Sequence, residues 1–139
     1  MWEYEHAVET SAAAGEVWRW WADVTSWSTW NAGVVDAVID GDFAAGTAFT
    51  MTGPDGDAIR MTLAEVAPGE RFVDVMDGGD FTVRTEHRLE PLDGGRTRVV
   101  YRTEISGPAA GHVGPELGPA ITADFPDVLD ALVRRAEKG

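Results

Sequence analysis

The C-terminal stretch from Gly107 to Gly139 constrains the fold of this chain more than any other segment. From about Pro115 onward, apolar residues recur at three- and four-residue steps, which predicts one long amphipathic helix. The apolar stripe consists of Leu117, Ile121, Phe125, Val128, Leu129, Leu132 and Val133. We expect Pro126 to bend or split this helix, because proline lacks the backbone N–H that a helix interior uses. A helix this apolar on one side needs a second layer to cover it.

The preceding residues predict a β-sheet that supplies this layer. Apolar and polar residues alternate from Trp2 to Glu9, and His6 falls on the apolar face of that segment, which is typical of a half-buried strand. Turn signals rich in Gly, Asp and Pro separate the later segments, and such short connections favour antiparallel neighbours. Strands are predicted at residues 2–9, 34–39, 47–52, 58–66, 71–76, 81–89 and 98–105.

Two short helices are predicted between the first and second strands. The first spans about Ala13 to Val24, after a possible N-cap at Thr10 and Ser11, and the second carries the Trp27 and Trp30 pair. The order of strand, two helices, six strands and long helix predicts an α+β fold. Because no linker or repeat interrupts residues 1–139, we expect a single domain.

Composition excludes several classes of partner and site. The net charge of -13, with only 11 scattered basic residues, argues against nucleic acid and anionic membranes. No apolar run approaches the roughly 20 residues that span a bilayer, so no membrane insertion is expected. The chain has no cysteine, and its first residues do not resemble an export signal, which favours a cytoplasmic protein.

Several short segments follow one another in the order of a known superfamily. They are residues 11–18 (SAAAGEVW), 27–34 (with Trp27, Trp30 and Gly33-Val34), 65–72 (EVAPGERF), 95–99 (GRTRV) and 105–108 (ISGP). Together they resemble the START-like superfamily, also called SRPBCC or Bet v 1-like. The similarity is greatest to its polyketide cyclase/dehydrase and lipid-transport branch.

The resemblance implies a helix-grip fold, in which a curved seven-stranded antiparallel sheet wraps around a long C-terminal helix. An elongated cavity lies between the two in this fold. The implied partner is a small hydrophobic molecule, polyketide-like or lipid-like, and the implied state is a monomer or homodimer. Because members include cyclases, aromatases, lipid carriers, receptors and co-chaperones, the fold alone does not assign a function.

His87 and Tyr101 are the candidate catalytic residues. Alternation places His87 on the apolar face of its strand, and the resemblance brings His6 and Tyr101 onto the same wall. An imidazole there can act as acid or base near neutral pH, and a phenol can donate to a developing enolate, as ring closure or dehydration requires. The alternative is that each is a buried polar group satisfied by a neighbour.

The other predicted ligand contacts are mainly apolar, as is usual for a small-molecule cavity. The predicted ligand-binding residues are His6, Trp30, Met61, Thr85, Thr103, Ile121 and Phe125. Trp30 and the two threonines have an equally ordinary interpretation as packing residues. The glycine- and proline-rich residues 114–119 are interpreted as a flexible lead-in to the last helix.

No cofactor or metal is expected. The three histidines are dispersed rather than paired at ligand spacing, and no glycine-rich phosphate motif follows a strand. Two functions fit this sequence. One is a cofactor-free cyclase/dehydrase acting on a hydrophobic molecule, and the other is a non-enzymatic binding or carrier protein.

Overall fold

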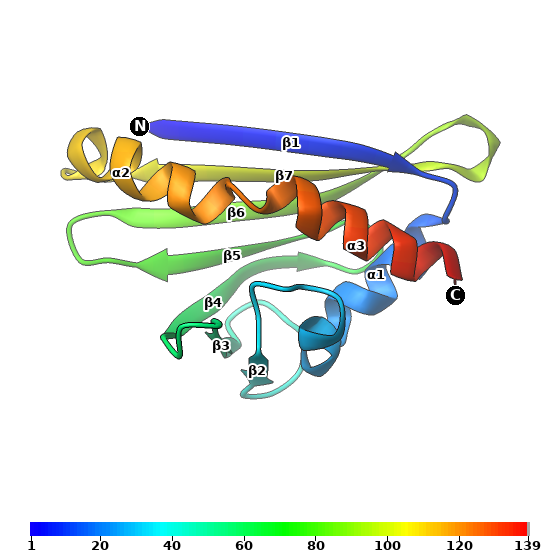
Figure 1. The fold of residues 1–139 in the computed structure, drawn as a ribbon, viewed down its shortest axis with the longest axis horizontal. Helices are drawn as coiled ribbons and strands as arrows, with labels where there is room; N and C mark the ends of the chain where they lie inside the picture. Colours follow the sequence, from blue (N-terminus) through cyan, green and yellow to red (C-terminus); the bar gives the residue numbers. More distant parts are fainter. Residues whose placement is uncertain (139) are drawn as a thin grey trace.

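A seven-stranded antiparallel sheet forms one layer of the structure, and two consecutive C-terminal helices cross one of its faces (Figure 1). The computed structural model describes residues 1–138. The strands are β1 (Trp2–Thr10), β2 (Asp36–Ile39), β3 (Ala48–Thr52), β4 (Ala58–Ala67), β5 (Arg71–Asp77), β6 (Thr82–Pro91) and β7 (Thr97–Ser106). The helices are α1 (Ala14–Ala22), η1 (Val24–Thr29), η2 (Asp93–Gly95), α2 (Ala110–Thr122) and α3 (Phe125–Lys138). This architecture confirms the predicted helix-grip fold.

The strand order is β1-β7-β6-β5-β4-β3-β2, so the N-terminal strand closes one edge and β2 the other. Each hairpin connects neighbouring strands, and β1 joins the sheet by pairing with β7. The register aligns His6, Tyr101 and His87 across β1, β7 and β6. Phe72 on β5 continues the same row. Because residues in register point to the same side of a sheet, this row fixes which side chains face the helices.

The C-terminal helix begins earlier than its apolar stripe predicts and is divided in two. The segment starts at Ala110 rather than near Pro115, and residues 123 and 124 separate α2 from α3. Pro126 explains the division, because it is the second residue of α3, where an N–H has no intrahelical partner. The expectation that Pro126 splits the helix is therefore confirmed.

The glycine- and proline-rich residues 114–119 lie inside α2, so the interpretation as a flexible lead-in is wrong. Close packing explains their place in a helix. A Cβ added at Gly114 or Gly118 would lie 2.5 Å from the Trp2 side chain, so only glycine lets α2 approach β1 this closely. The energy of that contact offsets the low helix propensity of glycine and proline.

The first helix is shorter than predicted. It ends at Ala22, and a 3-10 helix takes over at Val24 and runs to Thr29. Ala13 occupies the N-cap position without a side-chain bond, so the predicted cap at Thr10 and Ser11 is wrong. The Thr10 hydroxyl instead donates to Glu137 of α3.

The main core lies between the sheet, α1, η1 and α3. The apolar face of α3 is buried through Phe125, Val128, Leu129, Leu132, Val133 and Ala136. Against it pack buried side chains that include Val17, Trp21 and Phe72. In residues 1–138, no helix is long and apolar enough to cross a bilayer.

Candidate active site

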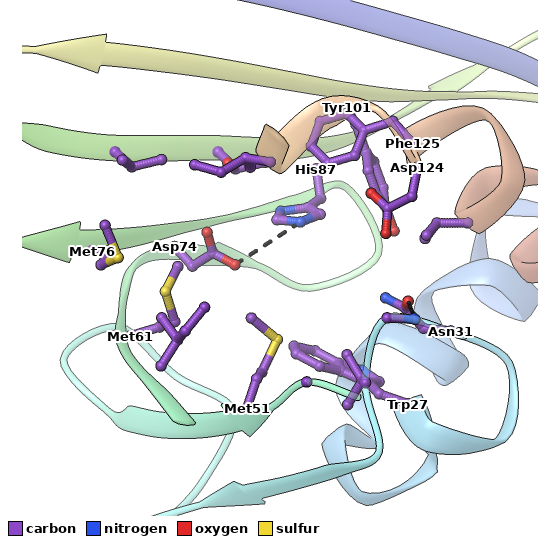
Figure 2. Close-up of a pocket in the computed structure, with 18 of the residues that line it drawn as sticks. Trp27, Asn31, Met51, Met61, Asp74, Met76, His87, Tyr101, Asp124 and Phe125 are labelled. Carbon is purple, nitrogen blue, oxygen red and sulfur yellow. Dashed lines mark hydrogen bonds and ion pairs between the residues drawn. The ribbon is translucent and has the colours of Figure 1, made fainter. Parts of the chain in front are cut away.

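A cavity of about 610 Å³ lies between the sheet and the C-terminal helices, beside η1. Strands β3 to β7 provide one side of it, while α2, α3 and the α2–α3 junction provide another. Figure 2 shows that Met51, Met61 and Met76 gather on the side opposite Tyr101 and Phe125. Methionine is unbranched and polarisable, so this wall can adapt to flat or irregular ligands.

His87 projects into the cavity from the middle of β6. Its ring stacks on Phe72 with centroids 3.9 Å apart and meets the edge of Tyr101 at 4.6 Å. Its Nδ1 atom lies 3.3 Å from the Phe72 carbonyl oxygen. Because a carbonyl only accepts, Nδ1 carries the proton and Nε2 keeps a free lone pair.

Burial keeps this imidazole neutral. Loss of water around His87 lowers its pKa from 6.5 to about 3, although the Phe72 carbonyl acts in the opposite direction. At neutral pH, Nε2 is therefore a proton acceptor rather than a cation. Nε2 is therefore free to accept a proton from a ligand, as a weak base whose strength an ionised Asp74 nearby would raise.

Asp74 on β5 is the second ionisable group in the cavity. It pairs in register with Thr85, two residues from His87, and this diagonal placement brings the two side chains together. Its Oδ2 atom lies 3.9 Å from Nε2 of His87, as the dashed line in Figure 2 marks. That distance exceeds a hydrogen bond, so the two groups face each other without being bonded.

Asp74 is nearly inaccessible, with only 7% of its side chain exposed. Burial raises its pKa from 3.8 to about 7, and no described residue donates a hydrogen bond that would offset this. Near neutral pH the carboxyl therefore exchanges its proton readily. An acid with a raised pKa beside a base with a lowered pKa is the pattern of a proton-transferring pair.

Tyr101 on β7 forms the adjoining wall. The Trp21 indole N–H donates to its hydroxyl oxygen at 3.1 Å, which leaves the phenol proton available for another acceptor. Burial raises the pKa of Tyr101 above its ordinary value, so the phenol stays protonated and can act as a donor.

Exposed acidic residues surround the mouth of the cavity. Asp55 and Asp57 lie on the β3–β4 turn, and Asp124 lies at the α2–α3 junction near Gly33. Partial burial raises the pKa of Asp124 above its ordinary value. No group of three metal-ligating side chains occurs within residues 1–138.

Most of the residues predicted from sequence lie on this cavity. Those that line it are Trp30, Met61, Thr85, His87, Tyr101, Ile121 and Phe125. Their roles in binding or catalysis stay predictions.

The predictions for His6 and Thr103 do not agree with the geometry, since neither residue lines the cavity. Thr103 is fully buried, and its hydroxyl lies 2.9 Å from that of Thr85. His6 lies on β1, against which α2 and α3 pack, and Tyr4 of the same strand makes an edge contact with Phe125. The shared row of His6, Tyr101 and His87 is therefore present, but only the latter two reach the cavity.

Comparison with known proteins places the chain in a family. The family model described as polyketide cyclase / dehydrase and lipid transport matches residues 1–137. No curated protein sequence matches the chain.

Solved structures share the fold at low sequence identity. Norcoclaurine synthase from Thalictrum flavum, solved in complex with dopamine and hydroxybenzaldehyde, is 16% identical over 98% of this chain and 86% of its own, with a TM-score of 0.78. The di-domain ARO/CYC StfQ from the steffimycin biosynthetic pathway is 18% identical over 98% of this chain and 50% of its own, with a TM-score of 0.76. A START superfamily protein from Mycobacterium smegmatis is 16% identical over 98% and 97% of the two chains, with a TM-score of 0.75.

Proposed function

The chain belongs to the polyketide cyclase/dehydrase and lipid-transport family, and from this premise we propose that it is a cofactor-free enzyme acting on a small, mainly apolar molecule. The cavity would hold the molecule, and His87, with Tyr101 or Asp74 as the proton donor, would move protons on it, as cyclisation or dehydration requires. Norcoclaurine synthase, which shares this fold and was solved with dopamine and hydroxybenzaldehyde, supports a ligand of that size. A cytoplasmic location and a monomeric or homodimeric state stay predictions.

The observation that carries this proposal is the buried Asp74 carboxyl beside the free Nε2 of His87. Burying a carboxyl without a hydrogen-bond partner costs folding free energy, on the order of 1–3 kcal/mol even for a neutral polar group. A carrier of apolar molecules would gain nothing from that cost, whereas an acid–base enzyme needs such a group. Strained or costly arrangements of this kind concentrate at functional sites.

The geometry suits proton transfer at a carbon next to a carbonyl. Nε2 of His87 would take the proton from that carbon, because its partner Nδ1 is already protonated and held by Phe72. The Tyr101 hydroxyl or the protonated Asp74 would donate to the carbonyl oxygen as the enolate forms. In a dehydration, the proton gained by Nε2 would then pass to the departing hydroxyl group, which leaves as water.

The second candidate is a carrier that binds the same class of molecule without changing it. The predominance of apolar side chains in the cavity wall, tryptophan, phenylalanine and methionine among them, favours it. Both candidates require an occupied cavity, so binding alone does not distinguish them. The two candidates are distinguished by whether the protein converts the bound ligand into a product.

The test begins with native mass spectrometry of the freshly purified protein, which would reveal a co-purified molecule and its mass. Compounds of that class are then incubated with the protein and with a His87→Gln variant. The enzyme proposal predicts conversion that falls by about a hundredfold or more in the variant while binding persists. His112→Gln is the matched control, because His112 lies exposed on α2, away from the cavity. Unchanged compound with both proteins would favour the carrier.

A further inference from the structure

The charged side chains that line the cavity all carry the same sign. Asp74 lies inside it, and Asp55, Asp57 and Asp124 lie at its mouth. No lysine or arginine is among the described lining residues. A ligand with a carboxylate or phosphate would therefore meet repulsion at the mouth and no partner inside.

The arginines of the sheet are directed to its other face. Arg71 pairs with Glu86 at 3.0 Å, Arg88 pairs with Glu86 at 2.7 Å, and Arg102 pairs with Glu104 at 3.2 Å. Alternation along the strands forces this arrangement, because Arg71 precedes the inward Phe72 and Arg88 follows the inward His87. These cations are neutralised by their own partners and supply no counter-charge to Asp74.

Asp74 itself lacks a hydrogen-bond partner among the described residues. More than nine-tenths of its side chain is buried, and within residues 1–138 it accepts no hydrogen bond. Figure 2 shows its carboxyl directed across the cavity toward His87. A buried carboxylate becomes favourable when an opposite charge and a donor reach it together, and an ammonium group is both.

The aromatic walls of the cavity also favour a cationic ligand. Trp21, Trp27, Trp30, Phe72, Tyr101 and Phe125 line the cavity. The negative faces of aromatic rings attract organic cations, with Trp the strongest. The acidic mouth and the net charge of -13 would raise the local concentration of cations before binding.

We propose that the ligand is an amine, with an apolar, ring-sized body and an ammonium group held by the Asp74 carboxylate. This inference rests on the proposed function and narrows its substrate class. It excludes ligands whose only polar group is a carboxylate or a phosphate. It assigns Asp74 to substrate recognition, so of the two donors proposed for the carbonyl oxygen it retains Tyr101, and Nε2 of His87 stays the proton acceptor.

Three probes of nearly equal size test the inference: phenylbutylamine, phenylbutanol and phenylbutyrate. Their affinities are measured by isothermal titration calorimetry at about pH 8, where the probe amine is protonated and Asp74 is ionised. We expect the amine to bind at least about tenfold more tightly than the alcohol, and the carboxylate to bind weakest. Asp74→Asn should remove the advantage of the amine and change the affinity of the alcohol by less than about threefold.

Asp130→Asn is the matched control, because Asp130 is an exposed carboxylate on α3 outside the cavity and its loss changes the net charge equally. A thermal melt of each variant, together with retained alcohol binding, shows that the fold is intact. The inference is overturned if the alcohol or the carboxylate binds as well as the amine. It is also overturned if the two variants weaken amine binding alike. Those results would contradict the preference for an amine but would still be consistent with ligand binding in the cavity. A failure of all three probes to bind would overturn the proposed function as well.

Discussion

Oδ2 of Asp74 lies 3.9 Å from Nε2 of His87, and the two side chains have pKa values shifted in opposite directions. Burial raises the pKa of Asp74 to about 7 and lowers that of His87 to about 3. Both groups are therefore neutral between these values, whereas the unfolded chain would hold them as an anion and a cation over much of that range. The opposed shifts make the pair visible in the pH dependence of stability.

The Asp74→Asn variant should gain stability relative to the wild type as pH rises. The folded protein keeps the Asp74 proton to about pH 7, whereas the unfolded chain loses it near 3.8. Because the folded state binds the extra proton in this window, Asp74 lowers the free energy of unfolding as pH rises through it, by on the order of 1 kcal/mol per pH unit. Urea unfolding at about pH 4 and about pH 7.5 measures this. A difference between variant and wild type that does not grow with pH would show that Asp74 is not buried as described.

His87→Gln should have the opposite pH dependence. The unfolded chain binds the His87 proton below 6.5, whereas the folded protein binds it only below about 3. The free energy of unfolding therefore rises with pH across this window in the wild type, and the variant should lose that rise. The same urea experiment, with His112→Gln as control, should give a variant-minus-wild-type difference that falls with pH. The difference in the free energy of unfolding between variant and wild type should thus rise with pH for Asp74→Asn and fall with pH for His87→Gln. A change in the same direction for both variants would contradict the opposed pKa shifts.

Trp30 and Trp27 both line the cavity, but their substitution should differ in its cost to stability. The Trp30 indole N–H is buried and has no hydrogen-bond partner within residues 1–138, whereas that of Trp27 donates to the Trp21 carbonyl at 3.1 Å. Trp30→Phe should therefore cost less than about 1 kcal/mol and change ligand affinity, while Trp27→Phe should cost about 1–3 kcal/mol. Thermal melts and a titration with phenylbutanol measure both. A large loss of stability with unchanged affinity would make Trp30 a packing residue and remove it from the site.

Glycine at position 118 should be required for the packing of α2. A Cβ there would lie 2.5 Å from the Trp2 ring, so Gly118→Ala should destabilise the protein by about 1–3 kcal/mol. Gly111→Ala is the matched control, because nothing lies within 4 Å of a Cβ at that position. Alanine favours helix over glycine, so this control should be neutral or stabilising by up to about 1 kcal/mol. Equal effects in chemical denaturation would mean that α2 is not held against β1 by this contact.

The sequence predicts the fold because its signals are local and repeated. Alternation marks each strand, turn residues mark each hairpin, and the apolar stripe marks the helix that covers the sheet. It does not predict where α2 begins, because the close contact of Gly114 and Gly118 with Trp2 involves a strand far away in sequence. Tertiary packing overrides helix propensity at these positions.

Asp74 is not among the site residues predicted from the sequence, although a signal for it exists. It alternates with Phe72 and Met76, both apolar, so the pattern of β5 places an acid on the inward face. A single acidic residue among apolar residues is also typical of the end of a strand or of a turn, so the sequence alone does not mark it as a buried group. Its closeness to His87 depends on the register between β5 and β6, which the residues of one strand do not specify.

Every function proposed for this protein requires that the cavity between the sheet and the C-terminal helices binds a small, mainly apolar molecule. A fluorescence titration with N-phenyl-naphthylamine, an uncharged dye that brightens in apolar surroundings, tests it on the wild type and on Met61→Trp. Met61 lines the cavity and is buried, so the bulkier indole side chain of the variant should fill part of the binding space. We predict saturable binding of about one dye per chain to the wild type and at least about tenfold weaker binding to the variant, with both proteins folded in a thermal melt. No saturable binding to the wild type, or equal binding to both folded proteins, would contradict the claim.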